Sequence, residues 1–325
     1  MRRTFDSEDE FVAWLRRNRQ VDPTGLRLGI GDDASLVQPS AGQEMILTAD
    51  LSIEGVHFLR DRHPPGAVGH RALARSLSDV AAMGGRPRFA LVSLALSDQV
   101  DRLWVETFYR GLLGLAARFG VALVGGDTSL SAKAVMADVT VVGEVARGRA
   151  LLRTGARPGD AIYVAGTLGL SAAGLKMLRS RSKLRATAAL RAHLYPEPQC
   201  RLGEFLSKKR LASAAIDISD GLSLDLARLL GASNVGGLIA EGKIPVPPVS
   251  RRDPTTISLA LNGGEDYKLL FTVPPAKIPL LPASFEGIRL YEVGRVCGKE
   301  HGILIEGRKG TRQLIPGGYD HFRRK

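Results

Sequence analysis

Gly29-Ile-Gly31-Asp32-Asp33-Ala34 sets a pattern that recurs along the chain, in which glycines flank adjacent carboxylates. An unpaired carboxylate is costly to bury, so such a loop seldom belongs to a core. Glycine lets a backbone approach a ligand closely, and carboxylate oxygens suit a hard cation such as Mg²⁺. Asp50 follows after one hairpin's length of chain. The stretch therefore predicts a loop that binds a ligand or a metal.

The same combination of glycine, hydroxyl and acid returns at Leu77–Asp79, Gly125–Thr128, Asp217–Gly221 and Gly263–Asp266. Many aspartates and few histidines favour Mg²⁺ over transition metals. Several Mg²⁺ ions are what two phosphate-bearing reactants need, because metals screen the repulsion between them before an in-line attack. The residues alone thus predict Mg²⁺-dependent phosphoryl transfer to a small molecule.

A dinucleotide fingerprint is a competing interpretation of Gly29–Ala34, since Gly29-x-Gly31-x-x-Ala34 matches it and Asp50 supplies the distant acid. The fingerprint needs a helix after the glycines. Residues 35–50 instead predict two short strands around Pro39–Gly42. The two carboxylates would also repel a pyrophosphate unless metal intervened. We therefore reject the Rossmann interpretation.

Size and composition are those of a globular protein of two domains. The chain has 325 residues, of which 44% are hydrophobic and 24% charged. We expect a boundary near Arg147–Arg149, with domains of residues 1–148 and 149–325. The sequence has no apolar run long enough for a membrane span and no signal-peptide core at residues 1–8. Cys200 and Cys297 lack metal or redox spacing, which favours a cytoplasmic location.

The net charge of +12 raises the alternative of a non-catalytic nucleic-acid-binding protein. Aromatic residues make up only 6% of the chain and do not interleave with the basic clusters. A ring of carboxylates would also repel phosphates without metal. We expect no nucleic-acid partner and no membrane partner, and attribute the charge to solvated faces and attraction of a polyanionic small molecule.

Periodicity and capping signals predict an alternation of helices and strands. Expected helices cover about residues 7–15, 66–82, 101–119, 171–178 and 223–230, and expected strands cover 45–48, 121–124, 137–145, 161–165, 268–273, 288–293 and 301–305. Gly125–Ser129 is expected to be a turn, and residues 236–248 a Gly/Pro-rich loop. The glycine loop Gly166–Gly169 before a helix predicts an anion site, although many α/β proteins show the same pattern.

Several enzyme classes are excluded by missing motifs. The sequence has no P-loop, no protein-kinase signature set, no zinc-type Cys/His cluster and no nucleophilic serine elbow. The motifs present, taken in order, resemble the thiamine-monophosphate kinase family, which has an aminoimidazole-ribonucleotide-synthetase-like fold. They are GIGDDA at 29–34, EGVHF at 54–58, LSDVAAMGG at 77–85, GGDTS at 125–129, DISDGL at 217–222, GGEDY at 263–267 and GYDHF at 318–322. The resemblance covers nearly the whole chain.

This resemblance implies a two-domain α/β fold of the synthetase type. The N-terminal domain would bind ATP and Mg²⁺ and pair its sheet with that of a second subunit in a barrel-like homodimer. The C-terminal α/β domain would complete the nucleotide and substrate site. The implied reaction is direct transfer of the ATP γ-phosphoryl group to thiamine monophosphate, which gives thiamine diphosphate and ADP without a covalent phosphoenzyme.

Matching motif positions imply the site residues. The implied Mg²⁺ ligands are Asp33, Thr48, Asp50, Asp79, Asp127, Asp217 and Asp220. The implied nucleotide contacts are Gly126, Asp127, Arg153 and Ser219, and the implied substrate contacts are His57, Glu265 and Tyr319. No covalent or acid–base catalyst is implied. In physical terms, Arg153 can form charge-assisted bonds to phosphate, and Glu265 can attract the positive thiazolium.

Two positions depart from the family pattern: Ala49 replaces a usual hydroxyl residue, and Ser76 an asparagine. The loss at Ala49 would weaken a metal site only if the hydroxyl coordinates. Among relatives, selenophosphate synthetase would need a reactive Cys within residues 1–25, and a hydrogenase-maturation protein would need a C-terminal Cys; this sequence has neither. Aminoimidazole-ribonucleotide synthetase remains the alternative, although it would lack the EGVHF and GYDHF motifs.

Overall fold

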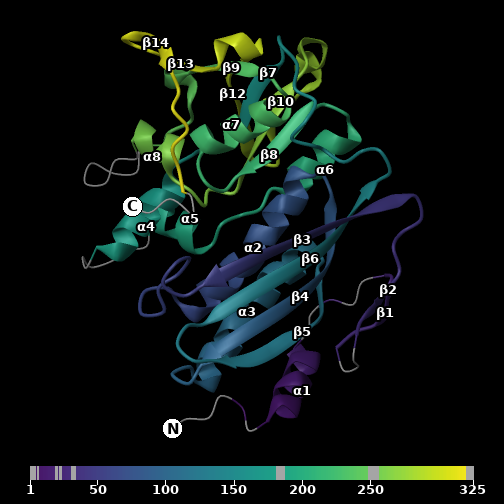
Figure 1. Ribbon diagram of the computed structural model, residues 1–325. Coiled ribbons are helices and arrows are strands. Elements are labelled where there is room, and N and C mark those ends of the chain that lie inside the picture. The colour runs from purple at the N-terminus through teal and green to yellow at the C-terminus, as the bar shows by residue number, and fades with distance from the viewer. Residues whose placement is uncertain are drawn as a thin grey trace. The chain divides into compact units, whose positions relative to one another are not determined.

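The computed structural model describes residues 5, 7–18, 21, 24–30, 34–180, 187–247 and 256–319. The chain forms two compact units, one of residues 1–80 with 85–148 and one of residues 81–84 with 149–325 (Figure 1). The expected mixed α/β class is confirmed. The functional roles predicted for residues 1–148 and 149–325 stay predictions. None of the described helices is long and apolar enough to cross a membrane.

A four-stranded sheet in the order β3-β6-β4-β5 is the centre of the first unit. β4 and β5 run parallel, whereas β6 is antiparallel to both β3 and β4. The elements of this part of the chain are α1 (Glu8–Asn18), β1 (Leu26–Leu28), β2 (Leu36–Val37), β3 (Gln43–Ile53), α2 (Pro65–Ala82), β4 (Arg86–Ser97), α3 (Arg102–Phe119), β5 (Ala122–Ser131) and β6 (Met136–Ala146).

The two faces of this sheet differ in polarity and cover. On β3, Ile46 and Ser52 are buried, whereas Leu47 is 69% exposed. Val80 of α2 lies against Gly143 of β6, so α2 covers the face on which Ile46 is buried. This alternation follows from the two-residue period of a strand. On the opposite face, Leu26 and Val37 of the β1–β2 hairpin pack against Phe89, Ala122 and Val124, whereas the side chains of β3 on that face are exposed.

Helices α2 and α3 approach each other backbone to backbone (Figure 1). A Cβ atom on Gly69 would lie 2.0 Å from the carbonyl oxygen of Phe108, and one on Gly111 would lie 1.9 Å from that of Gly66. Only glycine permits such a close approach. The predicted start and end of α3 are confirmed, because Asp101 accepts the Trp104 N–H at 2.9 Å and Gly120 ends the helix with φ 67°.

A mixed sheet in the order β14-β13-β9-β12-β7-β10-β8 is the centre of the second unit. Its strands are β7 (Ala161–Ala165), β8 (Ala214–Ile218), β9 (Gly236–Ala240), β10 (Lys268–Val273), β12 (Ile288–Cys297), β13 (Ile303–Gly307) and β14 (Gly310–Gln313), with β11 (Ser284–Phe285) beside β12. Its α-helices are α4 (Leu170–Arg179), α5 (Ala188–Leu194), α6 (Cys200–Lys208), α7 (Leu222–Ala232) and α8 (Ile257–Asn262). Leu226 and Leu229 of α7 pack in the same buried cluster as Ile162 and Ile216.

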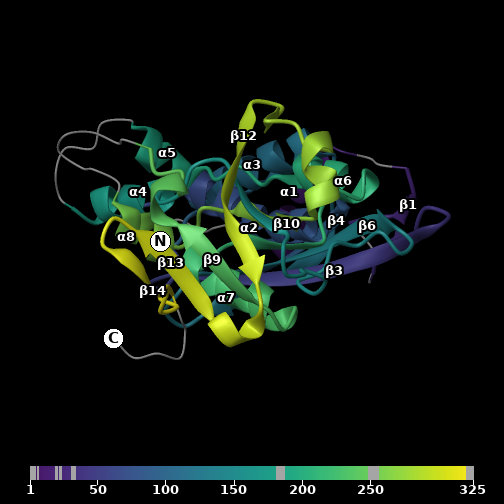
Figure 2. The same ribbon diagram turned by 90° about the horizontal axis from the view of Figure 1, so that it is seen from above.

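Two expectations about local structure are wrong. The Gly/Pro-rich segment 236–248 was expected to be a loop, but Gly236–Ala240 is strand β9, which lies between β12 and β13 (Figure 2). A Cβ atom on Gly236 would lie 2.5 Å from two carbonyl oxygens, so glycine is needed for packing and hides the strand pattern. Gly125–Ser129 is not a turn either, because β5 pairs with β4 through to Ser131.

Candidate functional site

The first unit brings three of the predicted metal ligands together. Thr48 and Asp50 are two residues apart on β3, on the face that α2 covers. The Thr48 hydroxyl donates to Asp79 Oδ2 at 2.5 Å, which joins β3 to the last turn of α2. Ala49 lies between them on the exposed face, so its lack of a hydroxyl removes no oxygen from the Thr48–Asp50 face.

Asp50 is held in part by an arginine. Arg75 Nε of α2 lies 3.5 Å from Asp50 Oδ1. Asp50 Oδ2 is buried, and no hydrogen-bond donor among the described residues reaches it. A buried carboxylate oxygen of this kind is expensive unless a partner is supplied, so it fits a cation. Ser76, one residue further along α2, donates to the Val139 carbonyl at 2.7 Å and fixes the helix to the sheet.

Asp127 lies one row away from Asp50 in the sheet register. Asp50 pairs with Val139, Val139 with Val92, and Val92 with Gly126. Asp127 is the next residue of β5, in the row of Ser93, Asp138 and Leu51, so the register places it on the exposed face opposite to that of Asp50. Gly126 has φ +150°, and a Cβ atom there would lie 1.9 Å from the Val92 carbonyl oxygen.

The donor chemistry of this unit suits a hard cation, since carboxylate and hydroxyl oxygens are the ligands that Mg²⁺ prefers. Within the described parts of the chain, no group of three or more His, Cys, Asp or Glu side chains is arranged to hold a metal ion. Asp33, another predicted ligand, lies outside the described residues. Thr48, Asp50 and Asp79 fit a metal through the chemistry of their oxygen donors and the unpartnered Asp50 Oδ2, and not through a closed cluster of ligands.

The His57 side chain contacts other residues of the first unit. Its Nδ1 accepts the Ile53 N–H at 3.0 Å. The ring also lines a cavity of about 10 Å³ with Arg71 and Arg75, a space on the scale of one water molecule. The contact predicted between His57 and the substrate stays a prediction.

The β1–β2 hairpin is held at both ends by residues outside the predicted motifs. Near its tip, Ser35 Oγ donates to the Val124 carbonyl at 2.5 Å, directly before Gly125 of β5. At its base, Arg88 donates to Ser40 Oγ at 3.1 Å and forms an ion pair with Glu144. Burial alone would raise the pKa of Glu144, but hydrogen bonds from Ser40 and the charge of Arg88 lower it. The signal available in the sequence was a charged residue, Arg88 or Glu144, within each of two apolar runs.

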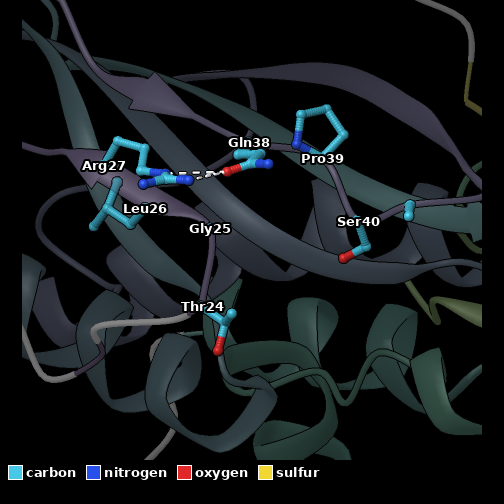
Figure 3. Close-up of a pocket in the computed structure, with 8 residues that line it drawn as sticks. Thr24, Gly25, Leu26, Arg27, Gln38, Pro39 and Ser40 are labelled. Atoms are coloured by element: carbon cyan, nitrogen blue, oxygen red, sulfur yellow. Dashed lines mark hydrogen bonds between the residues drawn. The ribbon is translucent and has the colours of Figure 1, made fainter.

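A pocket of about 460 Å³ opens at the base of the same hairpin (Figure 3). Arg27 Nε donates to Gln38 Oε1 at 3.1 Å across its wall. Thr24 and Ser40 also line the pocket. None of the predicted site residues does, so this hollow is separate from the acidic set.

In the second unit, Asp225 organises the loop between β8 and α7. Its Oδ2 accepts the backbone N–H groups of Ser219, Asp220 and Gly221 at 3.1, 3.0 and 3.1 Å. Its Oδ1 accepts Arg228 Nη1 at 2.7 Å. Burial raises the pKa of Asp225 to about 6, against the lowering effect of these hydrogen bonds and of Arg228. Sequence reasoning missed Asp225, although an acid in the first helical turn is a known capping signal.

The occupied amides decide how this loop can bind a ligand. Successive N–H groups at a helix N-terminus commonly bind phosphate. Here the Asp225 carboxylate already takes them. Ser219 and Asp220 are therefore left with side-chain oxygens, as is Asp217, which lies buried near the end of β8.

Backbone hydrogen bonds bring three sequence motifs together at this loop. The Glu265 N–H donates to the Ser219 carbonyl at 2.7 Å, and the Tyr319 N–H donates to the Asp220 carbonyl at 3.2 Å. Cβ atoms on Gly264 and Gly318 would lie 2.7 and 2.5 Å from those same two carbonyl oxygens. The glycines of GGEDY and of the C-terminal motif are thus required by close backbone approach.

Glu265 has a strained backbone and a buried neighbour. Its φ is +68°, a left-handed conformation that side chains rarely adopt. Its Oε2 lies 3.6 Å from Nδ1 of the fully buried His193. The same nitrogen is 3.1 Å from Ser171 Oγ. Strain that the surroundings maintain is common at functional sites.

The anion site expected at Gly166–Gly169 is filled by the protein itself. Asp266 accepts the N–H groups of Gly169 and Ser171 at 2.6 and 3.1 Å, at the start of α4. Burial raises the pKa of Asp266 to about 6. The expectation of a free anion site there is wrong, because a carboxylate from the GGEDY motif occupies it.

Arg153 and Ser219, both predicted nucleotide contacts, lie at opposite ends of β8. Ala215, at the start of the strand, donates its N–H to the Leu152 carbonyl at 2.8 Å, and Ser219 follows the end of the strand. Ser233 Oγ donates to the Arg153 carbonyl at 2.9 Å, while the Arg153 residue is exposed. No short hydrogen bond recorded for the described residues joins the two predicted contacts.

Comparisons with known proteins follow the same division of the chain. The AIR synthase related protein N-terminal domain matches residues 31–145, and the corresponding C-terminal domain matches residues 157–306. A thiamine-monophosphate kinase of Bacillus subtilis (strain 168) is 34% identical over 94% of this chain and 96% of its own length. That of Escherichia coli (strain K12) is 37% identical over 91% and 92%.

Solved structures give the same result. Thiamine-monophosphate kinase from Stenotrophomonas maltophilia K279a superposes with a TM-score of 0.81 at 33% identity, covering 94% of this chain and 96% of that one. AaThiL complexed with AMPPCP and TMP superposes with a TM-score of 0.78 at 32% identity, covering 99% of each chain. The hydrogenase maturation protein HypE, at 23% identity and a TM-score of 0.74, shares the fold.

Proposed function

Because this chain belongs to the thiamine-monophosphate kinase family of AIR-synthase-related proteins, we propose that it phosphorylates thiamine monophosphate to thiamine diphosphate with ATP. The observation that carries this conclusion is the full-length match to a structure that holds AMPPCP and TMP. The protein is a kinase with ATP as its co-substrate. The reaction is direct in-line transfer, with no residue assigned as a covalent or acid–base catalyst.

The second unit supplies the proposed substrate and nucleotide contacts around one loop. Ser219 contacts the nucleotide through its hydroxyl, since Asp225 occupies the loop amides. Glu265 attracts the positive thiazolium, and its strained backbone and the nearby His193 support a fixed orientation. Tyr319, whose side chain is 37% exposed, offers a ring face to the thiamine ring system. Gly126, Asp127, Arg153 and His57 complete the proposed contacts.

The proposed metal ligands are all oxygen donors. They are Asp33, Thr48, Asp50, Asp79, Asp127, Asp217 and Asp220. Bound Mg²⁺ would neutralise the phosphate charges that otherwise oppose transfer. The chain's own residues prepare this role: Thr48 orients the Asp79 carboxylate by donating to it, and Arg75 holds one oxygen of Asp50 while leaving the other buried without a donor among the described residues.

A homodimer formed through the first sheet is supported by its open apolar face. Met45, Leu47 and Leu51 of β3 are 44%, 69% and 45% exposed on the same side of the strand. Apolar side chains clustered in this way on a sheet mark an interface. Leu47→Glu would put a charge into that interface, so light scattering should give a dimer for the wild type and a monomer for the variant.

The direct test measures ADP release from ATP and Mg²⁺ with and without thiamine monophosphate, and follows thiamine diphosphate in the same samples. Equal amounts of both products, formed only when thiamine monophosphate is present, are expected. A sample without Mg²⁺ serves as control. If ATP binds but thiamine monophosphate does not stimulate ADP release, the acceptor is that of another AIR-synthase-related protein, such as aminoimidazole-ribonucleotide synthetase, which the two matching domains also favour.

A further inference from the structure

Arg228 of α7 joins two carboxylates through a single nitrogen. Its Nη1 donates to Asp220 Oδ2 at 2.6 Å and to Asp225 Oδ1 at 2.7 Å. The Asp225 side chain is fully buried, whereas that of Asp220 is 25% exposed and that of Arg228 39%. One of the two acids therefore belongs to the interior, and the other faces solvent together with the arginine.

The two acids do different work. Asp225 fixes the loop by accepting three backbone N–H groups. Asp220 is fixed by its backbone on both sides, because its N–H donates to Asp225 and its carbonyl accepts the Tyr319 N–H. What remains free to turn is the Asp220 side chain. Its carboxylate can leave Arg228 and bind another cation while the loop stays in place.

We propose that Arg228 is an internal counter-cation that holds the Asp220 carboxylate in the metal-free protein and competes with a divalent cation for it. This inference rests on the proposed function, in which Asp220 is a metal ligand. The positive charge of Arg228 has two effects on the neighbouring carboxylates. Arginine stabilises the neighbouring carboxylates while no metal is bound, and its positive charge lowers the affinity of the same carboxylates for a second cation.

The test is a titration of the full chain with Mg²⁺ and Mn²⁺ in the absence of nucleotide and thiamine monophosphate. The measured quantities are the thermal midpoint as a function of Mg²⁺ concentration and the Mn²⁺ dissociation constant from electron paramagnetic resonance. Arg228→Met removes the charge and Arg228→Lys retains it. Arg312→Met is the control for removing an arginine from an ion pair, since Arg312 forms a more exposed pair with Glu241 far from the loop in sequence.

Arg228→Met should lower the midpoint without metal, bind Mn²⁺ roughly two- to five-fold more tightly, and regain much of the lost midpoint as Mg²⁺ is added. Arg228→Lys should lie near the wild type, and Arg312→Met should not change the metal response. Unchanged or weaker Mn²⁺ binding by a folded Arg228→Met protein overturns the inference. Arg228→Gln, which keeps a hydrogen-bond donor without the charge, replaces it if Arg228→Met does not fold.

The inference and the proposed function can fail separately. Asp220→Asn should abolish the effect of Arg228→Met on Mn²⁺ binding; if the effect persists in the double variant, the inference is wrong whatever the enzyme phosphorylates. Tighter Mn²⁺ binding by Arg228→Met, combined with no thiamine diphosphate formed by the wild type, would instead support the counter-cation and refute the proposed reaction.

Discussion

Asp50 of the first unit lies on a strand, whereas Asp220 of the second unit lies in a loop. Asp50 owes its position to sheet register, since it pairs with Val139 in the middle of an eleven-residue strand. Asp220 follows a strand, where no ladder hydrogen bonds can hold it. Its position depends on a buried anchor, Asp225, and on two close approaches by glycine.

This difference shows that a carboxylate on a strand and a carboxylate in a loop are held in place by different interactions. A strand carries its side chains in fixed alternation and needs only one local partner for each acid. A loop has to satisfy its own backbone N–H groups, and in the second unit a dedicated carboxylate does so. Substitutions of the first group should therefore affect chemistry more than folding, and substitutions of the loop anchor should affect both.

The largest expected effect follows Asp50→Ala, which removes a proposed metal ligand from a strand whose register does not depend on it. Turnover should fall at least about 10³-fold, equivalent to roughly 4 kcal/mol of transition-state stabilisation. Circular dichroism and light scattering should match the wild type. Asp61→Ala, at an exposed acid, is the control. Full activity of Asp50→Ala would refute the role of the strand-borne acids.

Asp225→Ala should destabilise the protein, whereas Asp50→Ala on the strand should not. It leaves three N–H groups without their acceptor and Arg228 without its buried partner, so the free energy of unfolding should fall by roughly 3–5 kcal/mol. Urea unfolding measures the loss. A stability equal to that of the wild type would mean that the loop needs no anchor, and the contrast between the two units would be lost.

The pH dependence of stability tests another buried carboxylate of the second unit, Asp266. The pKa of Asp266 is about 6 in the folded chain against 3.8 ordinarily, so its stabilising contribution is complete below pH 4 and is lost as the pH rises through 6. Lys268 and Glu265 face the same group. The unfolding free energy of the wild type should fall by about 3 kcal/mol relative to Asp266→Asn between pH 4 and 7. A constant difference in urea titrations at several pH values would contradict this.

The smallest expected effect concerns the glycine that adjoins Asp127. Gly126→Ala places a Cβ atom against the Val92 carbonyl and should lower the free energy of unfolding by roughly 2 kcal/mol. The backbone amides of β5 should then exchange their hydrogens faster. Gly114→Ala is the matched control, because an added Cβ atom there meets nothing and should stabilise α3 by up to about 1 kcal/mol. Equal thermal midpoints for the two variants would show that the register at Gly126 tolerates a side chain.

Much of the architecture could be predicted from the sequence, because periodicity and capping are local. Helix α3 follows from Asp101, its apolar spacing and Gly120. Strands β2 and β3 follow Gly29–Ala34 as predicted, where a Rossmann fold needs a helix, and this excludes that fold; β2 pairs with β1 and not with β3. β9 was missed because its glycines are required by packing against chain that is distant in sequence, which no local pattern reveals.

The candidate ligands of the site could be predicted from the sequence, but the residues that hold them in place could not. The motifs identify Thr48, Asp50 and Asp79, and the structure joins them. Asp225, Arg228 and Ser35 were missed, since each acts through a contact with a backbone group or with another charged side chain. Whether an acid binds a ligand or holds a loop depends on which amides it meets, and that is decided only by the fold.

The backbone contact between α2 and α3 has a consequence for how the sequence can vary. Alanine at Gly69 or Gly111 would collide with a carbonyl oxygen of the other helix at about 2 Å. A library that randomises both positions should return glycine almost alone, while exposed Gly114 on the same helix should accept many residues. The two glycines at the crossing therefore fix the distance between α2 and α3, while the positions around them can accept other residues.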